Sequence, residues 1–305
     1  MDLSKHAFFE GKFVPLSDAK VNIATHAFLY GTSVFGGMRA YWNEEKKRLF
    51  VFRPYDHFRR LLHSARMMSM QTSYDEESLI QITLDLLRMD NWREDIYFRP
   101  TFYKADLGIG VRLHDVSDQF SIFVTAHEKY VKNDSNAHVT FSSWRRIDDN
   151  VIPARAKVAG AYVNSSLIKS DALQAGFDEA LVLDQNGHVS EGSAMNVFMV
   201  RDGMLVTPPV TDNILEGITR KTVIELARRE LGIEVVERSI DRTEVYVAEE
   251  MFFTGTAAGV TIITKVDHRP VGGGKPGPVA TKLRDLLEDA VRAKNSRYEH
   301  WNVAV

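Results

Sequence analysis

The sequence predicts an α+β protein of two domains, a small α/β domain followed by a larger, β-rich one. Three observations support this prediction. The chain has 305 residues, about twice the ~150 residues of an average domain. Its shares of hydrophobic (44 %) and charged residues (26 %) are typical of folded, water-soluble proteins. Helix and strand patterns are mixed in the first part, whereas short β-branched and aromatic segments dominate the second.

A polar stretch near the middle of the chain marks the expected domain boundary. Residues 129–137 contain the run Lys-Asn-Asp-Ser-Asn and show no apolar periodicity, so they are expected to form an interdomain linker. The small α/β domain is then expected to cover residues 1–128, and the large β-rich domain residues 138–305.

Turn and helix-start signals define the elements of the first domain. Residues 6–16 place apolar stretches on either side of a Glu-Gly-Lys turn and predict a hairpin. Pro54 suits the first turn of a helix, because its missing N–H is not needed there. Ser73 followed by Glu76 has the spacing of a capping box and predicts a second helix. Further strands are predicted at residues 36–42, 48–53, 95–105 and 119–126.

The second domain is predicted to be mostly β-structure with three helices. Asn164 as an N-cap and Gly176 as a C-terminal signal predict a helix over residues 164–175. Gly232 predicts the end of another helix that covers residues 218–231. A charged helix is expected from residue 279 onward. Strands are predicted within residues 137–144, 179–184, 188–200, 203–209, 233–239 and 250–264.

Composition excludes several classes of function. The net charge is −3 and no long stretch carries only one sign of charge, so nucleic acid is not an expected partner. There is no apolar run of membrane-spanning length and no signal-peptide pattern at the N-terminus, so a cytoplasmic protein without a membrane anchor is expected. The absence of cysteine excludes disulfides and thiolate zinc sites. The histidines lack metal-ligand spacing, so no metal is expected, and no serine lies in a Gly-x-Ser-x-Gly elbow.

Lys157 is the first candidate for chemistry. It lies in a run of small and apolar residues that offers no charge partner, and desolvation there would lower the pKa of its amine toward that of a usable nucleophile. On this argument alone, a surface lysine without a function is the commoner interpretation.

Two glycine-bearing turns are candidates for anion binding. Residues 216–220 enter a helix whose first N–H groups, with the Thr219 hydroxyl, suit a phosphate, and residues 254–259 form a second turn of small residues. An ordinary N-cap and tight strand packing are the alternatives. Neither turn matches a P-loop or a G-x-G-x-x-G motif, so no nucleotide is indicated.

Two charged residues in strand-like segments are further candidates. Residues 190–192 are expected to interrupt a strand pair, and if Glu191 points inward it needs a cationic or proton-bearing partner. The strand period places Tyr97, Arg99 and two neighbouring polar residues on one face, where a guanidinium suits carboxylate recognition. An exposed hairpin glutamate and a solvent-facing edge strand are the alternatives.

Together, these segments resemble the branched-chain amino acid aminotransferases, which are fold-type IV pyridoxal-phosphate enzymes with a D-amino acid aminotransferase-like fold. The resemblance follows the family's order from residues 26–35 through Lys157 to residues 256–258 and covers nearly the whole chain. It implies a transaminase that moves the amino group of leucine, isoleucine or valine to 2-oxoglutarate by a ping-pong mechanism.

The resemblance also implies roles for individual residues. Lys157 is expected to hold the cofactor pyridoxal 5′-phosphate as a Schiff base and then to carry the proton between substrate and cofactor. Glu191 is expected to keep the ring nitrogen protonated, Tyr162 to bond the ring's O3′, and Arg60, rather than Arg59, to bind the phosphate. The other cofactor residues implied are Leu215 on the ring face and Ile218, Thr219 and Thr256 at the phosphate.

A substrate pocket and an oligomer follow from the same resemblance. The pocket has an apolar side and a carboxylate-binding side for amino acid and 2-oxo acid substrates. Neighbouring subunits share active sites, so a homodimer or higher oligomer is expected. Arg112 is a further candidate for carboxylate binding, with a solvated loop arginine as the simpler interpretation. The pocket residues implied are Tyr30, Phe35, Tyr97, Arg99, Ala257 and Ala258.

Some positions depart from the family's pattern. Gly36 stands where the family usually has glutamate, Ala161 where asparagine is common, and Ala194-Met195 where many members have Gly-Glu. These changes leave the cofactor residues intact but widen the possible substrates. A transaminase for (R)-amines or D-amino acids is one alternative, and a pyridoxal-phosphate lyase such as aminodeoxychorismate lyase is another. The Tyr97-x-Arg99 pair counts against the lyase, and the intact cofactor residues count against an inactive binding module.

Overall fold

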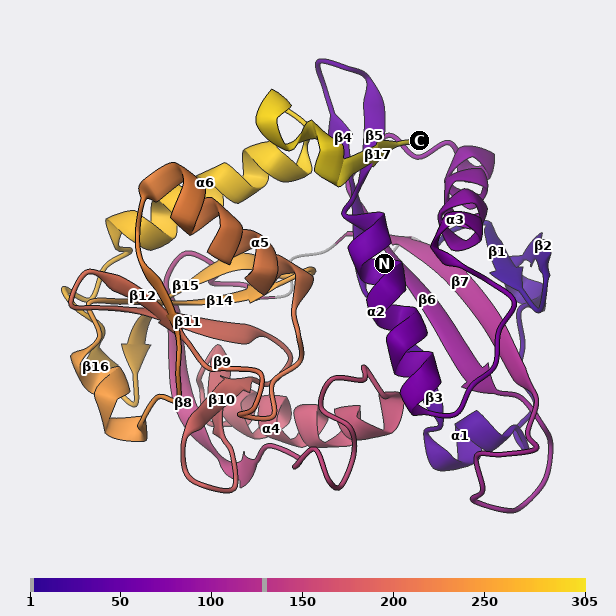
Figure 1. Cartoon of the computed structure of the whole chain (residues 1–305), viewed down its shortest axis with the longest axis horizontal. Coiled ribbons are helices and arrows are strands. Elements are labelled where there is room, and N and C mark those ends of the chain that lie inside the picture. Colours follow the sequence, from indigo (N-terminus) through magenta and orange to yellow (C-terminus); the bar gives the residue numbers. More distant parts are fainter. Residues whose placement is uncertain (1–2, 128–130) are drawn as a thin grey trace. The chain divides into compact units, whose positions relative to one another are not determined.

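The computed structural model describes residues 3–127 and 131–305, and the chain forms two compact units (Figure 1). The first unit contains the described residues up to 127 together with Ala156–Ala161 and Ala290–Val305. The second unit contains residues 131–155 and Tyr162–Asp289. The sequence-based division into residues 1–128, 129–137 and 138–305 stays a prediction, and part of the expected linker, residues 129 and 130, lies outside the described residues.

An antiparallel sheet forms the first unit. Its strands are β1 (His6–Phe9), β2 (Lys12–Pro15), β3 (Ser33–Phe35), β4 (Met38–Asn43), β5 (Arg48–Phe52), β6 (Ile96–Lys104), β7 (Asp118–Ala126) and β17 (Asn302–Ala304). They lie in the order β17-β5-β4-β6-β7-β1-β2, and β3 pairs with β6. The predicted hairpin at residues 6–16 and the four predicted strands are confirmed. Apolar side chains alternate toward the core because successive side chains of a strand point to opposite faces.

The helices of the first unit are α1 (His26–Tyr30), α2 (Pro54–Met67) and α3 (Glu76–Asp90), with a 3₁₀ turn at Leu16–Asp18. The predicted start of α2 at Pro54 is confirmed, and Figure 1 shows α2 in front of the first sheet. The capping box predicted from Ser73 and Glu76 is wrong. Asp75 accepts the Ser78 N–H (2.8 Å), and the Ser78 hydroxyl accepts the Asp75 N–H (2.9 Å). The carboxylate of Asp75 accepts the first-turn N–H of Ser78, so the helix begins directly after Asp75.

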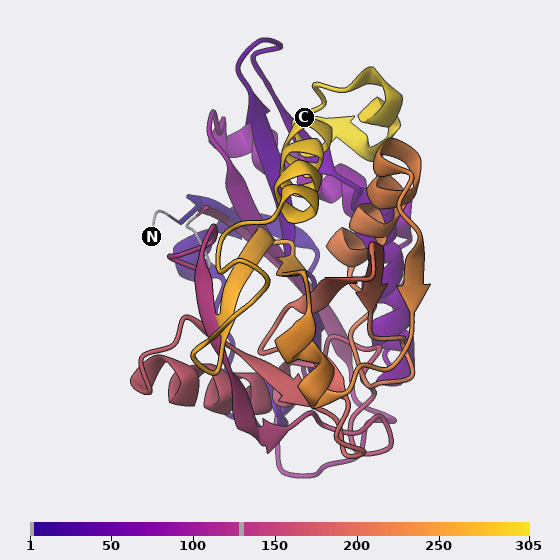
Figure 2. The ribbon, with the colours of Figure 1, turned by 90° about the vertical axis from the view of Figure 1, so that its left-hand side faces the viewer.

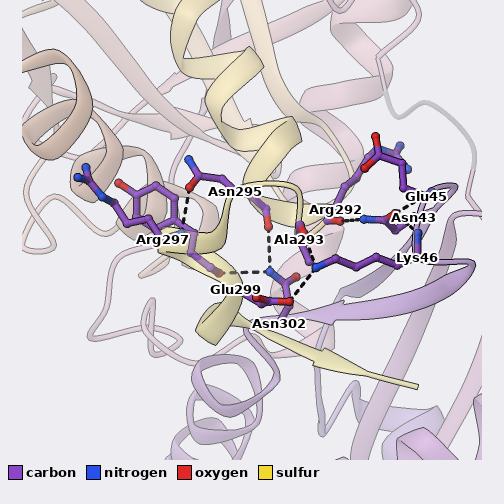
Figure 3. A network of polar contacts seen from close by, with 11 residues as sticks. Asn43, Glu45, Lys46, Arg292, Ala293, Asn295, Arg297, Glu299 and Asn302 are labelled. Atoms are coloured by element: carbon purple, nitrogen blue, oxygen red, sulfur yellow. Dashed lines mark hydrogen bonds and ion pairs between the residues drawn. The ribbon is translucent and has the colours of Figure 1, made fainter.

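The C-terminal segment belongs to the first unit through a network of polar contacts (Figure 3). Lys46 donates to the carbonyl of Ala293 (3.0 Å) and pairs with Glu299 (2.7 Å). Arg292 forms a two-pronged ion pair with Asp95, with N–O distances of 2.9 and 2.7 Å. Strand β17 then pairs with β5 at the edge of the sheet. Pairing with a distant strand therefore places the last residues of the chain.

A mixed sheet forms the second unit. Its strands are β8 (Ala137–Arg145), β9 (Glu179–Leu183), β10 (Val189–Gly192), β11 (Asn196–Arg201), β12 (Met204–Thr207), β13 (Val235–Glu237), β14 (Glu250–Gly255), β15 (Gly259–Val266) and β16 (Arg269–Pro270). The order is β10-β9-β8-β15-β14-β11-β12-β13, with β16 beside β15. Figure 2 shows magenta β8 beside orange-yellow β15, a parallel pair. One apolar core packs on this sheet and includes Val139, Leu181, Met199 and Phe253.

The helices of the second unit are α4 (Tyr162–Gln174), α5 (Ile218–Leu226) and α6 (Pro278–Val291), the last of which ends in the first unit. The predicted N-cap at Asn164 is wrong, because the helix starts at Tyr162 and the Asn164 amide donates to the Arg145 carbonyl instead (3.1 Å). Helix α5 continues as a π-helical turn to Leu231 and ends at Gly232, whose φ is +62°, as predicted. Short 3₁₀ turns lie at Ala159–Ala161, Arg242–Val247 and Ser296–Trp301. None of the described helices is long and apolar enough to cross a membrane.

Candidate active site

Lys157 is held through its backbone in the first unit. Its carbonyl accepts the N–H of Phe35 (3.0 Å), and its own N–H donates to the hydroxyl of Ser64 (3.2 Å). Its ammonium nitrogen lies 5.1 Å from the centroid of the Phe35 ring. Strand β3 and helix α2 therefore fix the main chain at the residue that the sequence singled out for chemistry.

A contact between two glycines fixes the residues that follow Lys157. Gly31, with a φ of +66°, accepts the N–H of Gly160 through its carbonyl (3.1 Å). A Cβ atom on Gly31 would lie 2.8 Å from the Cα of Gly160, which is too close for two carbon atoms that are not bonded. Only glycine at position 31 meets both the left-handed conformation and the close approach.

Helix α2 brings positive charge to the neighbourhood of Lys157. Burial lowers the pKa of His57 well below its usual value, and the charges of Arg60, Lys157 and Arg53 lower it further. Arg60 is half-buried, whereas Arg59 is exposed and pairs with Glu76 (3.4 Å). This difference favours Arg60 over Arg59 as the residue for a buried anion. The cationic surroundings suit a phosphate.

Strand β6 presents a polar face, as the strand period predicted. Tyr97 and Arg99 are half-buried on that face, and Phe98 is buried on the other. The Arg99 guanidinium donates to the Tyr97 hydroxyl (3.0 Å), and its central carbon lies 4.6 Å from the centroid of the Phe35 ring. Its Nε is buried and finds no acceptor among the described residues. A donor in this condition suits a carboxylate oxygen from a bound molecule.

The two glycines after Phe35 leave space for other side chains. A Cβ on Gly37 would lie 2.3 Å from the Tyr97 hydroxyl oxygen, so the Tyr97 ring rests directly on Gly37. A Cβ on Gly36 would lie 2.8 Å from the Pro100 ring. The glutamate common in the family at position 36 therefore does not fit this backbone without a shift of Pro100.

Tyr30 and Arg112 belong to the surface around α1. The Tyr30 hydroxyl accepts the N–H of Gly110 (3.1 Å), which ties the loop around residue 110 to α1. Arg112 in this loop is exposed. The structure thus gives Arg112 the setting of a solvated loop arginine.

Glu191 is the centre of a polar network in the second unit. Residues 190–192 were expected to interrupt a strand pair, and the register between β10 and β9 does shift between Val189 and Glu191. Glu191 lies within β10 and is 3 % exposed. Its Oε1 pairs with Arg146 (2.9 Å), and its Oε2 accepts from the Asn196 amide and the Leu215 N–H (both 3.1 Å). All three neighbours are donors, so they favour the charged carboxylate. Sequence reasoning assigned no role to Arg146 or Asn196. Arg146 is distant in the chain from Glu191, and Asn196, although only five residues from Glu191, also bonds the more distant Leu215.

The start of α5 provides open N–H groups in the same unit. Gly217 is the N-cap and offers no side chain to the first turn, in which Ile218 and Thr219 are buried. Uncapped N–H groups at a helix start bind anions well. The second predicted anion turn, residues 254–259, covers the end of β14, the connection at residues 256–258 and the start of β15. Tyr162 is the first residue of α4.

The predicted site residues therefore form one group in each unit. In the first unit the structure brings together Lys157, Phe35, Tyr97 and Arg99, with Arg60 on the helix that binds the Lys157 backbone. In the second unit it joins Glu191 directly to Leu215. Among the described residues, no three His, Asp or Glu side chains gather in a metal-binding arrangement.

Comparisons with known proteins agree on one family. The family model described as amino-transferase class IV matches residues 33–266. A probable branched-chain-amino-acid aminotransferase of Aquifex aeolicus (strain VF5) is 46 % identical over 295 residues, which is 97 % of this chain and 95 % of that protein.

Solved structures give the same result. The branched-chain aminotransferase of the thermophilic archaeon Thermoproteus uzoniensis, solved with norvaline, superposes with a TM-score of 0.94 at 38 % identity and covers 99 % of both chains. The enzyme from Thermobaculum terrenum in its PLP form has a TM-score of 0.94 at 36 % identity, covering 100 % of this chain and 99 % of that one. The predicted two-domain α+β fold of type IV is thereby confirmed. The chain belongs to the class IV aminotransferases, within the family of branched-chain amino acid aminotransferases.

Proposed function

We propose that this enzyme uses pyridoxal 5′-phosphate to transfer the amino group of L-leucine, L-isoleucine or L-valine to 2-oxoglutarate by a ping-pong mechanism. The observation that carries the proposal is Lys157, whose backbone is fixed by Phe35 and Ser64 beside the cationic helix α2. The substrate class follows from the similarity to branched-chain aminotransferases over nearly the full length of the chain.

The residues present fit this cofactor. The buried carboxylate of Glu191, held by three donors, suits a protonated ring nitrogen. The uncapped first turn of α5 suits a phosphate, as does the guanidinium of Arg60. Lys157 supplies an amine that suits an aldehyde.

Each residue then has a defined task. When bound, pyridoxal phosphate supplies an aldehyde that reacts with amines and a ring that accepts electrons from the substrate's α-carbon. Lys157 holds the cofactor and moves the proton at the α-carbon. Glu191 keeps the ring nitrogen protonated, and Tyr162 donates to the ring's O3′. Leu215 packs on the ring face, and the phosphate is bound by Arg60, Ile218, Thr219 and Thr256.

The substrate pocket has two kinds of surface. Phe35 and Tyr30, with the turn residues Ala257 and Ala258, contact the branched side chain. Arg99, supported by the Tyr97 hydroxyl, binds the carboxylate of 2-oxoglutarate, because its guanidinium carries a buried N–H without an acceptor among the described residues.

A homodimer with shared active sites is part of the proposal. Exposed apolar side chains gather on the first unit around α1 and the loop that bonds Tyr30, and they include Phe28, Leu107, Ile109 and Val111. Exposed apolar residues in such number are typical of a protein interface. Light scattering of the purified enzyme tests this, with a monomer of full activity as the contrary result. Cytoplasmic residence stays a prediction.

The substrate proposal is tested by a half-reaction panel. The holoenzyme is mixed separately with L-leucine, L-valine, D-alanine and (R)-1-phenylethylamine, and the absorption of the bound cofactor is followed for conversion to its amino form. Conversion by the two L-amino acids supports the proposal. Conversion by D-alanine or the (R)-amine alone overturns the proposed substrate class. It favours a transaminase for D-amino acids or (R)-amines, with a substrate pocket altered at Gly36.

A further inference from the structure

Asn196 has no role in the proposed function, yet its buried side chain forms several contacts. It lies at the start of β11 and is 5 % exposed. Its side-chain amide donates to the Oε2 of Glu191 (3.1 Å) and to the carbonyl of Leu215 (2.9 Å). The Leu215 N–H donates to the same Glu191 oxygen (3.1 Å). These three hydrogen bonds form a closed ring.

The other end of the Asn196 side chain faces the start of α5. A Cβ on Gly217 would lie 2.0 Å from the Asn196 Oδ1, so this oxygen occupies the space beside Gly217. Gly217 is the N-cap of the helix that opens with Ile218 and Thr219. One buried amide therefore contacts both the Glu191 carboxylate and the residue from which α5 begins.

We propose that Asn196 is a positioning residue that sets the spacing between the Glu191 carboxylate and the first turn of α5. The inference rests on the proposed function, in which these two places bind the ring nitrogen and the phosphate of one cofactor molecule. Such a molecule has a nearly fixed distance between its two ends. It gains from both anchors only when their spacing matches, as in any two-point binding of a rigid ligand.

Arg146 has a different task in the same network. It pairs with Glu191 (2.9 Å) and donates to the carbonyl of Asn213 (3.0 Å). Removal of Arg146 changes the charge beside Glu191, so its effects on binding combine electrostatics with position. Asn196 is uncharged, so its replacement leaves the net charge beside Glu191 unchanged.

Three variants and three ligands test the proposal. Asn196→Ala removes the two hydrogen bonds, and Gly217→Ala displaces Asn196 from the other side. Asn302→Ala is the matched control, because the Asn302 amide also donates to two carbonyls, those of Ala290 and Tyr298, in the first unit. The dissociation constants of the apoenzymes are measured for pyridoxal 5′-phosphate, for pyridoxal, which lacks the phosphate, and for inorganic phosphate.

Asn196→Ala and Gly217→Ala are each expected to raise the dissociation constant for pyridoxal 5′-phosphate at least tenfold. The constants for pyridoxal and for inorganic phosphate are expected to rise less than threefold. Asn302→Ala is expected to change all three constants less than twofold. The proposal is overturned if Asn196→Ala weakens the binding of all three ligands equally, or if it leaves the affinity for pyridoxal 5′-phosphate unchanged. It is also overturned if Asn302→Ala changes the three constants in the pattern expected for Asn196→Ala.

Folding is checked by circular dichroism and thermal unfolding of each apoenzyme. If Asn196→Ala does not fold, Asn196→Ser and Gly217→Ala are judged by the same criteria, and failure of all three to fold overturns the proposal by showing a purely structural residue. Wild-type protein that does not take up pyridoxal 5′-phosphate contradicts the proposed function. Wild-type protein that binds it while the variants retain its affinity contradicts only the role of Asn196.

Discussion

Different kinds of hydrogen bond hold Lys157 and Glu191 in place. The structure fixes Lys157 through its main chain, where the N–H donates to Ser64 and the carbonyl accepts from Phe35. It fixes Glu191 through its backbone, which pairs with Val182 in β9, and also through the carboxylate, which has donors on both oxygens. The bonds to Ser64 and Phe35 thus place the backbone of Lys157, whereas the three donors hold the charged group of Glu191 itself.

The difference matches what each group has to do in the proposed reaction. The amine of Lys157 changes its bonding partners during each turnover, so a fixed backbone serves it. Glu191 keeps one charge state throughout, so donors that surround the carboxylate serve it. Changes at the carboxylate of Glu191 should therefore affect both stability and activity, whereas loss of the Lys157 amine, which leaves its two backbone bonds in place, should affect activity most.

The largest effect is expected from Lys157→Ala. Loss of the amine removes the covalent attachment of the cofactor and the group that moves the proton. The rate of amino transfer from leucine to 2-oxoglutarate should therefore fall about 10²- to 10⁴-fold. The apoenzyme should unfold at nearly the wild-type urea concentration. Lys47→Ala, at an exposed pair with Glu44, is the control and should change neither property. Full steady-state activity of Lys157→Ala would contradict the assignment.

Glu191→Gln should affect both properties. The amide replaces one acceptor oxygen by a donor that faces other donors, and it leaves the half-buried Arg146 without its counter-charge. Turnover should fall about 10²- to 10³-fold, and the free energy of unfolding of the apoenzyme by about 3 kcal/mol. Steady-state kinetics and urea unfolding measure the two. A stable but inactive variant would break the contrast with Lys157, since the donors would then contribute nothing to folding.

Ser64→Ala tests the anchor at the root of Lys157. Ser64 is 1 % exposed, and its hydroxyl donates to the Arg60 carbonyl (2.9 Å) while it accepts the Lys157 N–H. The variant should lose about 1–3 kcal/mol of unfolding free energy. Its kcat should fall by less than about 10²-fold, the cost of a misplacement of about 1 Å.

The matched control for Ser64→Ala is Thr83→Val in α3. The buried Thr83 hydroxyl also donates to a carbonyl one turn back, that of Leu79 (2.8 Å), but Thr83 has no contact with the Lys157 segment. Thr83→Val should lose about 1 kcal/mol with an unchanged kcat. A similar kcat loss in both variants would show that Ser64 acts only through the stability of its unit.

The sequence predicted features that local patterns determine. The hairpin at residues 6–16, the start of α2 at Pro54 and the alternating faces of β6 each depend on a few neighbouring residues. The errors arose where local signals compete or where distant contacts decide. Two capping pairs lie close together before α3, and the one with the Asp75 carboxylate is used. Asn164 donates to a carbonyl of β8 rather than to its own helix start. Strand β17 has no local signal and exists through its pairing with β5.

The candidate site shows the same division. Lys157 and Glu191 stand in recognisable sequence segments, so both could be named from the sequence. Asn196 stands five residues after Glu191 in the same segment. Its bond to Leu215 and the ion pair of Arg146 could not be predicted, because these contacts join the end of β8, the start of β11 and the loop at Leu215. Side-chain hydrogen bonds between such segments depend on the register of strands, which composition and spacing do not specify.

The response to acid also separates the two regions. The donors at Glu191 are an arginine, an asparagine and a peptide N–H. Beside Lys157, by contrast, burial and nearby cations hold the pKa of His57 well below its usual value. Below pH ~6.5 the unfolded chain takes up a proton at this residue and the folded chain does not, so the free energy of unfolding falls as the pH falls. His57→Gln should therefore flatten the pH dependence of the free energy of unfolding by up to about 1.4 kcal/mol per pH unit.

His127→Gln is the comparison. Burial lowers the pKa of His127 to about 4, so the effect of this variant should be confined to the window between about pH 6.5 and 4. Urea unfolding of the apoenzymes from pH ~4 to ~8 measures both slopes, and a wild-type slope in His57→Gln would mean that the surroundings of Lys157 do not exclude the proton.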